Sequence, residues 1–324
     1  MSGTPVLLDI YAAHRRLRRY LTRTPLIRSE WLSSVADAEV CLKIESLQLS
    51  RSFKIRGALN ALLTISDRAG AARIPTIVTA SAGNHGRALA LAGEMLGLRV
   101  VVFTPQTAPE TKKVAIRRHG AELRDDPPDY DAAEREARAY AASEGALYVS
   151  PYNDADVIAG AGTIALEILE ILPQLDVLVV PLGGGGLASG LALALKNIAP
   201  GVRVIGVEVE ASTPFATGIA RGAITEIAPR TSLADGLTGN LERGSMTFDI
   251  VRAHVDAFVS VSESDLERAM RGLAAEDHLI AEGAGATATA AVIAGRAVEP
   301  GQKAVVMLTG GNIDLEKFAK VICS

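Results

Sequence analysis

The chain has few of the features that mark disulfide-rich, membrane-spanning or nucleic-acid-binding proteins. Its 324 residues include two cysteines, Cys41 and Cys323, too few for a disulfide framework or a cysteine-based metal site. The formal net charge of -4 argues against a general nucleic-acid or membrane-surface partner. No stretch predicts a membrane span, and no basic N-terminal segment leads into an apolar run. We therefore expect a cytoplasmic protein with reduced thiols and no signal peptide.

Aromatic residues are also scarce, at 4%, whereas 48% of the residues are hydrophobic. Alanine, valine, leucine and isoleucine must therefore build the core. This composition favours buried parallel strands that are covered by helices. The length predicts one large domain or two of medium size.

Strand and helix patterns alternate along most of the chain. Buried strands are predicted at residues 76–80, 99–104, 176–181, 203–208 and 303–308. A long helix is predicted over 154–172, broken by Gly160 and Gly162. Repeated strand–helix units predict an α/β fold with parallel sheets and helices on both faces. Ligands of such sheets bind beyond the carboxyl ends of the strands, and several glycine-rich loops lie there.

Lys54 begins a helical pattern in the segment Ser-Phe-Lys-Ile-Arg-Gly-Ala, residues 52–58. An amine at a helix N-terminus, with its stem beside apolar residues, can lose its proton more easily than one in water. A neutral lysine amine can form a Schiff base with an aldehyde. The alternative is an ordinary surface lysine in a first helical turn, and this segment alone does not exclude it.

Four consecutive glycines, residues 183–186, join a predicted strand to a predicted helix. Their backbone N–H groups can converge on an anion, and the helix dipole adds a favourable potential, so the loop predicts a phosphate site. A Walker loop is excluded because no Gly-Lys-Ser/Thr follows, and the spacing of a dinucleotide fingerprint is not met. A tight turn without a ligand is the remaining alternative.

Two further loops follow predicted strands. In Ser81-Ala82-Gly83-Asn84-His85-Gly86, the Ser81 hydroxyl and the Asn84 amide could hold a carboxylate or a ring oxygen. His85 is either a base or, as is more common, a structural loop residue. In Thr309-Gly310-Gly311-Asn312, the Thr309 hydroxyl could bind a ring nitrogen, although a simple turn would explain this motif alone.

In this order, the four motifs resemble those of the pyridoxal-phosphate enzymes of the tryptophan-synthase-β fold, known as fold type II. Threonine/serine dehydratases and serine racemases are the most similar groups, and the similarity covers almost the whole chain. It implies two doubly wound α/β lobes. The larger, cofactor-binding lobe would comprise residues 1–74 and 151–324, and the smaller, mobile lobe would comprise residues 75–150.

The resemblance also implies roles for the cofactor-binding residues. Lys54 would form the Schiff base with pyridoxal 5'-phosphate and, when released, take the α-proton of the substrate. Phe53 would pack beside the cofactor ring, Asn84 would face its ring oxygen, and Thr309 would meet the pyridine nitrogen, where Ser or Cys is common. The phosphate would lie against Gly183, Gly184, Gly185, Gly186 and Leu187.

The substrate is expected at Ser81, Gly83, His85 and Asp235. Two departures from the racemases stand out. Their acid/base serine is replaced by Ala82, whose methyl group cannot move a proton. Their divalent-cation site uses a glutamate, here Glu208, and an acid six residues later, here Pro214. We therefore predict no metal site, although Glu208 stays a possible ligand that Glu210 could support.

The resemblance implies a dehydratase, or ammonia-lyase, that converts L-threonine or L-serine to a 2-oxo acid and ammonia. A serine racemase is the second possibility. A dehydratase for 3-hydroxyaspartate or for an intermediate of hydroxyectoine breakdown, and a cofactor-binding protein without catalysis, also stay open. The expected partners are a small amino-acid substrate and a second copy of the chain, in a homodimer.

Overall fold

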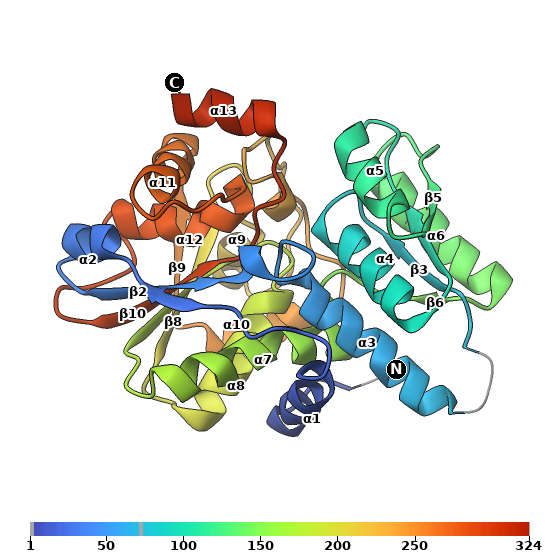
Figure 1. Cartoon of the computed structure of the whole chain (residues 1–324), viewed down its shortest axis with the longest axis horizontal. Helices are drawn as coiled ribbons and strands as arrows, with labels where there is room; N and C mark the ends of the chain where they lie inside the picture. Colours follow the sequence, from blue (N-terminus) through green and yellow to red (C-terminus); the bar gives the residue numbers. More distant parts are fainter. Residues whose placement is uncertain (1–2, 71–73, 324) are drawn as a thin grey trace. The chain divides into compact units, whose positions relative to one another are not determined.

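The computed structural model describes residues 3–70 and 74–323, which divide into two compact units (Figure 1). Unit 1 comprises Met1–Leu21 and Lys54–Ala161, and unit 2 comprises Thr22–Phe53 and Gly162–Ser324. The smaller lobe expected from the sequence, residues 75–150, lies within unit 1. The chain passes between the two units at three peptide bonds, one of which joins Phe53 to Lys54.

Unit 1 is built on a four-stranded parallel sheet with the strand order β5-β4-β3-β6. The strands are β3 (Ile77–Ala80), β4 (Val100–Phe103), β5 (Glu122–Arg124) and β6 (Leu147–Tyr148). Along β3 and β4, alternate side chains enter two different cores. Ile77 and Val102 belong to one core, and Val78 and Val101 to the other, so both faces of the sheet are buried.

Helices cover both faces of this sheet. One face carries α4 (Asn84–Leu96), with α3 (Lys54–Ala69) and α5 (Glu110–Arg117) packed against it, and the other carries α6 (Tyr130–Glu144). The alanine-rich stripe of α6 lies in the second core, with Ala133 and Ala137 fully buried. The α/β prediction is therefore confirmed for this unit.

Helix α7 (Ala155–Ile171) is continuous, so the expected break at Gly160 and Gly162 is wrong. A Cβ on Gly160 would lie 2.4 Å from the carbonyl oxygen of Arg56, and a Cβ on Gly57 would lie 2.7 Å from the carbonyl oxygen of Val157. Glycine at 57 and 160 therefore allows α3 and α7 to approach closely. These glycines serve helix packing rather than helix termination.

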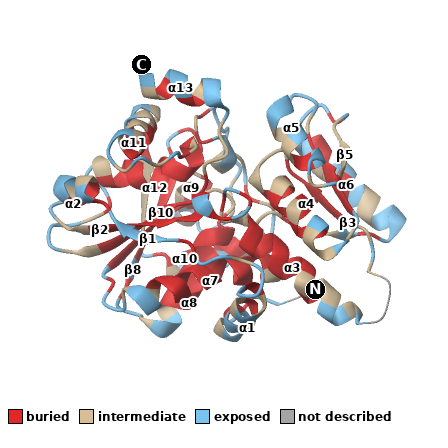
Figure 2. Ribbon diagram, in the orientation of Figure 1, coloured by how far each residue is buried: buried red, intermediate tan, exposed pale blue. Residues whose placement is uncertain are grey.

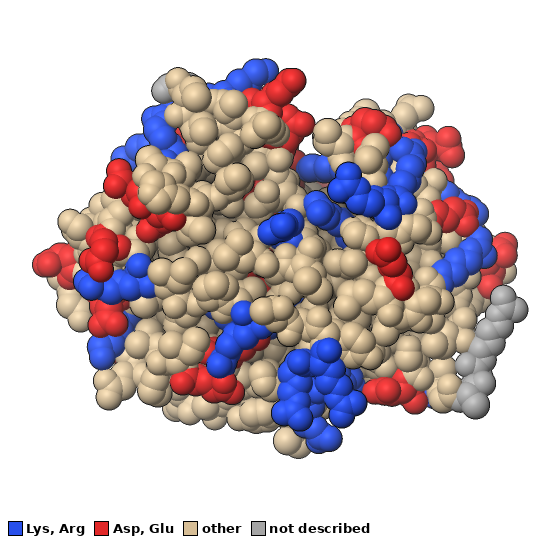
Figure 3. Space-filling model, viewed as in Figure 1, with Lys and Arg blue, Asp and Glu red and all other residues tan. Residues whose placement is uncertain are grey.

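The first helix, α1 (Leu7–Leu17), carries its basic residues near its C-terminal end. Arg15 and Arg16 lie in its last turn, where positive charge is favourable. Arg16 pairs with Asp67 at 3.2 Å. A group of Lys and Arg side chains covers the place of α1 in the space-filling view (Figure 3).

Unit 2 is built on a six-stranded sheet with the order β1-β2-β10-β7-β8-β9. All neighbouring strands are parallel except β1, which pairs antiparallel with β2. The strands are β1 (Leu26–Arg28), β2 (Glu39–Ile44), β7 (Val177–Pro181), β8 (Arg203–Val209), β9 (Ala257–Val261) and β10 (Lys303–Leu308). The edge strand β1 was not predicted, because three partly exposed residues give no periodic signal.

Two layers of helices enclose this sheet (Figures 1 and 2). The buried helix α12 (Gly283–Ile293) crosses one face, and α8 (Gly186–Ile198) covers the other. The remaining elements are α2 (Glu30–Ala36), α9 (Pro214–Arg221), α10 (Met246–His254), α11 (Glu263–Ala275), α13 (Leu315–Cys323), η1 (Glu45–Leu47) and η2 (Asp235–Leu237). Within residues 3–70 and 74–323, no helix is long and apolar enough to cross a membrane.

Candidate active site

Lys54 is the first residue of α3, where the chain leaves the loop that follows β2. Its Nζ donates a hydrogen bond to the carbonyl oxygen of Pro151 at 2.8 Å. Loss of hydration lowers the pKa of the amine from 10.5 to about 8. A substantial fraction of Lys54 is therefore neutral near pH 8, which is the state that a nucleophilic lysine requires.

The loop between β3 and α4 carries four of the predicted residues. Gly83 is the N-cap of α4, Asn84 is its first residue, and the N–H of Gly83 donates to the Ser81 hydroxyl at 3.2 Å. A Cβ built on Gly83 meets no atom within 4 Å. The first turn of α4 thus presents backbone N–H groups beside open space, an arrangement that can bind a carboxylate.

His85 is 2% exposed and lies within the same turn. Its Nε2 donates to the carbonyl oxygen of Val149 at 3.3 Å, which leaves Nδ1 as an acceptor with no hydrogen-bond partner among the described residues. Burial and the nearby charge of Lys54 lower the pKa of His85 to about 3. The imidazole is therefore neutral at physiological pH and has no ring proton to give to a substrate from Nδ1.

Unit 1 brings Lys54 and His85 together through one short segment. Lys54 binds the carbonyl of Pro151 and His85 binds the carbonyl of Val149, two residues earlier in the chain. The Thr79 hydroxyl also donates to Val149, at 2.8 Å, and fixes this segment to β3. The positions of both predicted residues thus depend on the backbone after β6.

The four-glycine loop lies between β7 and α8, as the sequence predicts. Gly185 is the N-cap of α8, with φ at +82°, and the Thr247 hydroxyl donates to the carbonyl of Gly184 at 2.8 Å. A Cβ on Gly185 would lie 2.5 Å from the ring of Phe215. Both backbone conformation and space therefore require glycine at 185, and the loop leads directly into the N-terminus of α8, where an anion is favourable.

Within unit 2, the segment of Asp235 lies beside this loop, and Thr309 is hydrogen-bonded to Phe53. A Cβ on Gly183 would lie 3.0 Å from the Cα of Leu237, at the end of η2, the short helix that Asp235 begins. The Thr309 hydroxyl donates to the carbonyl of Ala284 at 3.3 Å. The N–H of Phe53 donates to the carbonyl of Thr309 at 3.0 Å.

Glu208 has a structural role that the sequence did not reveal. Its buried carboxylate accepts the N–H groups of Phe215, at 2.8 Å, and Ala216, at 3.0 Å, at the start of α9. Pro214, the residue that stood against a metal site, occupies the first turn of α9. No group of three or more His, Cys, Asp or Glu side chains in the described parts of the chain could hold a metal ion. Burial raises the pKa of Glu208 to about 7.

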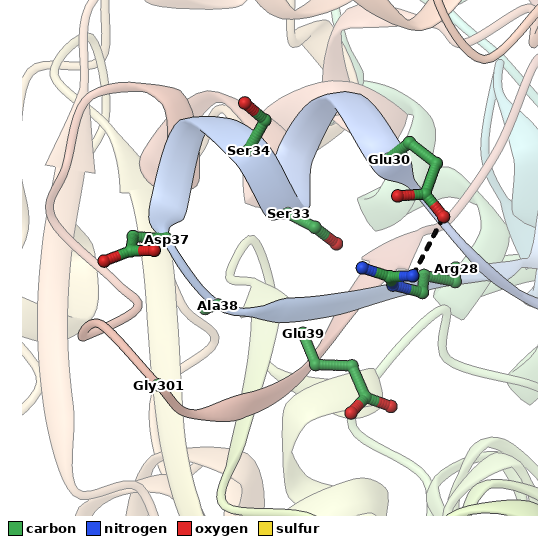
Figure 4. A pocket seen from close by; sticks show the side chains of 8 residues that line it. All are labelled: Arg28, Glu30, Ser33, Ser34, Asp37, Ala38, Glu39 and Gly301. Atoms are coloured by element: carbon green, nitrogen blue, oxygen red, sulfur yellow. Dashed lines mark hydrogen bonds and ion pairs between the residues drawn. The ribbon is translucent and has the colours of Figure 1, made fainter.

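A shallow depression elsewhere in unit 2 has no comparable chemistry (Figure 4). It lies where β2 and β10 begin, at the opposite ends of the strands from the glycine loop. Its lining residues are Arg28, Glu30, Ser33, Ser34, Asp37, Ala38, Glu39 and Gly301. The Arg28 guanidinium forms an ion pair with the Glu30 carboxylate at 3.0 Å, so the positive charge in this lining already has a partner.

Comparison with known proteins gives a family and full-length relatives. The sequence profile of the family described as "Pyridoxal-phosphate dependent enzyme" matches residues 17–310. The L-threonine ammonia-lyase of Thermotoga maritima is 39% identical over 98% of this chain and 78% of its own length. The solved threonine deaminase from T.th. is 37% identical, with a TM-score of 0.87, and the match covers 96% of this chain and 99% of that one. A solved pyridoxal 5'-phosphate-dependent aspartate racemase is 33% identical, with a TM-score of 0.90 over 98% and 99% of the two chains.

Proposed function

Because this chain belongs to the family of pyridoxal-phosphate-dependent enzymes, we propose that it is an ammonia-lyase for a small β-hydroxy amino acid. L-Threonine and L-serine are the proposed substrates, each converted to a 2-oxo acid and ammonia. Similarity to the threonine ammonia-lyase and the threonine deaminase supports this choice. The observation that carries the proposal is Lys54, an amine of lowered pKa at the position where the family motif has its lysine.

The residues of the candidate site fit pyridoxal phosphate. At Gly185 a Cβ would collide with Phe215, and the N-terminus of α8 follows directly, so the loop of residues 183–186 suits a phosphate group. Thr309 places a neutral hydroxyl group, rather than a carboxylate, in the same neighbourhood. Lys54 supplies an amine that can react with the aldehyde.

By matching motif, we assign Lys54 to the aldehyde, Asn84 to the ring oxygen, Thr309 to the pyridine nitrogen and Phe53 to the ring face. The phosphate is assigned to Gly183, Gly184, Gly185, Gly186 and Leu187. The carboxylate of the substrate is assigned to the first turn of α4, with Ser81, Gly83 and His85, and Asp235 is assigned to the rest of the substrate. Open space beside Gly83 supports the carboxylate assignment.

When bound, pyridoxal phosphate withdraws electrons from the α-carbon of an amino acid and so makes its proton acidic. In this proposal Lys54 takes that proton onto Nζ, for which a pKa of about 8 suits a base at neutral to mildly alkaline pH. The carbonyl of Pro151 accepts an N–H of Lys54 and so orients the amine. His85, held neutral with its Nε2 proton on Val149, contributes a hydrogen-bond acceptor rather than an acid.

The alternative is racemisation, which the similar aspartate racemase structure brings into consideration. Racemisation requires a second group that returns a proton to the opposite face of the α-carbon. A positioned acid or base contributes about 10²–10⁴-fold to such a step. Ala82 has no proton to return, and the neutral His85 already donates its proton to Val149. Elimination needs no group on the opposite face: Lys54 takes the α-proton and its ammonium can return a proton to the departing β-hydroxyl, which leaves as water, so elimination is favoured.

Assays of ammonia and of chirality test the reaction. The holoenzyme is incubated with L-threonine, L-serine, 3-hydroxyaspartate and a hydroxyectoine-derived amino acid, and ammonia is measured beside the D- and L-isomers. We expect ammonia from L-threonine or L-serine and little D-isomer, and Ala82→Ser should raise D-serine formation while elimination continues. Equal rates of D-serine and pyruvate formation by the wild type would instead establish the racemase.

Peptide mapping after borohydride reduction tests the assignment of Lys54. Reduction fixes the cofactor to the amine that holds it, so the labelled peptide should contain Lys54. Lys54→Ala should lose both the label and the visible absorbance of the bound cofactor. A label on any other lysine would disprove the assignment.

The proposal also includes the cellular compartment and the oligomeric state of the protein. Two cysteines without a disulfide and a net charge of -4 support a cytoplasmic enzyme. A homodimer is proposed as the oligomeric state. Sedimentation of the holoenzyme would measure its mass directly.

A further inference from the structure

The loop that carries Thr309 pairs with the segment that leads to Lys54. Within unit 2, Phe53 donates its N–H to the carbonyl of Thr309 at 3.0 Å, and Gly311 donates its N–H to the carbonyl of Arg51 at 3.0 Å. An antiparallel bridge joins Ser52 to Gly310 between these two hydrogen bonds. Residues 51–53 and 309–311 thus form a short two-stranded ladder.

Asn312 extends this ladder with its side chain. Its Nδ2 donates to the carbonyl of Ser50 at 2.9 Å, one step beyond the last backbone rung. Ser50 is fully buried, so its carbonyl gains little from water if that donor is lost. Arg51, whose carbonyl accepts the N–H of Gly311, has φ at +60°, a left-handed conformation that costs a non-glycine residue energy and needs support from its neighbours.

We propose that Asn312 is a positioning residue that, by holding the Ser50 carbonyl, sets where the chain enters Lys54. Two residues assigned to the cofactor depend on the ladder, because Thr309 lies on one side and Phe53, whose peptide bond leads into Lys54, lies on the other. The ladder therefore fixes the backbone of Phe53, and with it the start of the peptide bond that leads into Lys54. This inference rests on the proposed cofactor site, but it assigns Asn312 no contact with the cofactor.

Gly310 and Gly311, which precede Asn312 in this loop, are held by other contacts. The Asn312 side chain is therefore the part of the loop that a substitution can test. The N–H of Glu282 donates to the carbonyl of Gly310 at 3.1 Å, and a Cβ on Gly285 would lie 2.1 Å from the same oxygen. A Cβ on Gly311 would lie 2.8 Å from the carbonyl of Ile280. Gly310 and Gly311 are thus fixed by backbone contacts, so loss of the Asn312 amide should loosen the Ser50 side of the ladder first.

Asn312→Asp is the test variant, because it keeps the shape of the side chain and replaces the N–H donor with an oxygen that repels the Ser50 carbonyl. Asn197→Asp is the matched control, since Asn197 also donates Nδ2 to a backbone carbonyl in unit 2, that of Leu193 at 2.8 Å. Apoprotein of each variant is titrated with pyridoxal phosphate, and the absorbance of the bound cofactor is then followed against pH. Urea unfolding of the apoproteins checks that each variant folds.

We expect Asn312→Asp to weaken cofactor binding about tenfold, the upper range for one lost hydrogen bond, and to shift the pH midpoint of the cofactor absorbance. Asn197→Asp should change neither. Equal binding and equal pH midpoints for the two variants would refute the positioning role. If Asn312→Asp does not fold, Asn312→Ala removes the donor without adding charge and allows the same comparison. Failure of the wild type to bind pyridoxal phosphate would instead refute the proposed function.

Discussion

The buried carboxylate of Glu208 should make the stability of the protein fall as pH rises toward neutrality. Burial raises its pKa from 4.5 to about 7, although it accepts two backbone N–H groups at the start of α9. The folded protein therefore keeps this proton over a range of pH in which the unfolded chain has released it. By linkage, the free energy of unfolding decreases between about pH 4.5 and pH 7 and levels off above that range.

The size of the effect follows from the shift in pKa. One pKa unit corresponds to 1.36 kcal/mol, so a change from 4.5 to about 7 amounts to about 3 kcal/mol for this group. Glu208→Gln removes the titration and keeps the shape of the side chain. The variant should be about 1 kcal/mol less stable than the wild type at pH 5, because an amide caps α9 less well than a carboxyl group. Relative to the wild type, it should then gain about 2.5 kcal/mol between pH 5 and pH 8, because part of the effect already lies below pH 5.

Urea unfolding of the two apoproteins at pH 5, 6, 7 and 8, followed by circular dichroism, measures this difference. Glu263→Gln is the control, because the Glu263 carboxylate also accepts a backbone N–H in unit 2, from Leu233 at 2.8 Å. This control variant measures how much stability is lost when an amide replaces a carboxylate that accepts a backbone N–H. A difference between wild type and Glu208→Gln that stays constant from pH 5 to pH 8 would contradict the raised pKa and the explanation from burial.

Two further predictions concern the lysine and the glycine loop. Because burial lowers the pKa of Lys54, the rate at which the apoprotein captures pyridoxal phosphate should rise with pH and have its midpoint near pH 8. The rate is measured by absorbance, with N-acetyl-lysine as the reference amine. A midpoint near pH 10 would contradict the lowered pKa. Gly185→Ala should lower the free energy of unfolding by about 1–3 kcal/mol more than Gly222→Ala, measured in urea. Both glycines have positive φ, but only a Cβ at 185 would meet another side chain, that of Phe215, so equal losses would disprove the steric argument.

The alternation of strands and helices could be predicted because the strands are buried on both faces. Apolar runs such as Val177–Pro181 and Lys303–Leu308 stand out from the polar helices and loops around them. The loops that follow those strands could be located for the same reason. Lys54 and the glycines at 183–186 could then be singled out, because their chemistry depends on residue type and on a place at a strand or helix end.

Interactions between distant segments could not be predicted in this way. The hydrogen bond from Asn312 to Ser50 joins residues 262 positions apart, and no local pattern marks it. The resemblance to the racemases makes Glu208 a potential metal ligand, because their cation site uses a glutamate at this place. In the folded chain both oxygens accept N–H groups of α9, which lies beyond the end of its own strand. The sequence identifies each polar group, but the hydrogen bonds that the group makes depend on the fold.

Three glycines show why one residue type can have different structural roles. Gly160 looked like a helix breaker, but the helix continues through it because the carbonyl of Arg56 occupies the space of its missing side chain. Gly222 ends α9 in a left-handed conformation and faces open space. Gly185 combines a positive φ with a close neighbour, Phe215, at the start of a helix. Gly185 leads into a helix N-terminus, where an anion is favourable, so the atoms opposite a glycine and its place in an element distinguish an anion site from a turn or a packing contact.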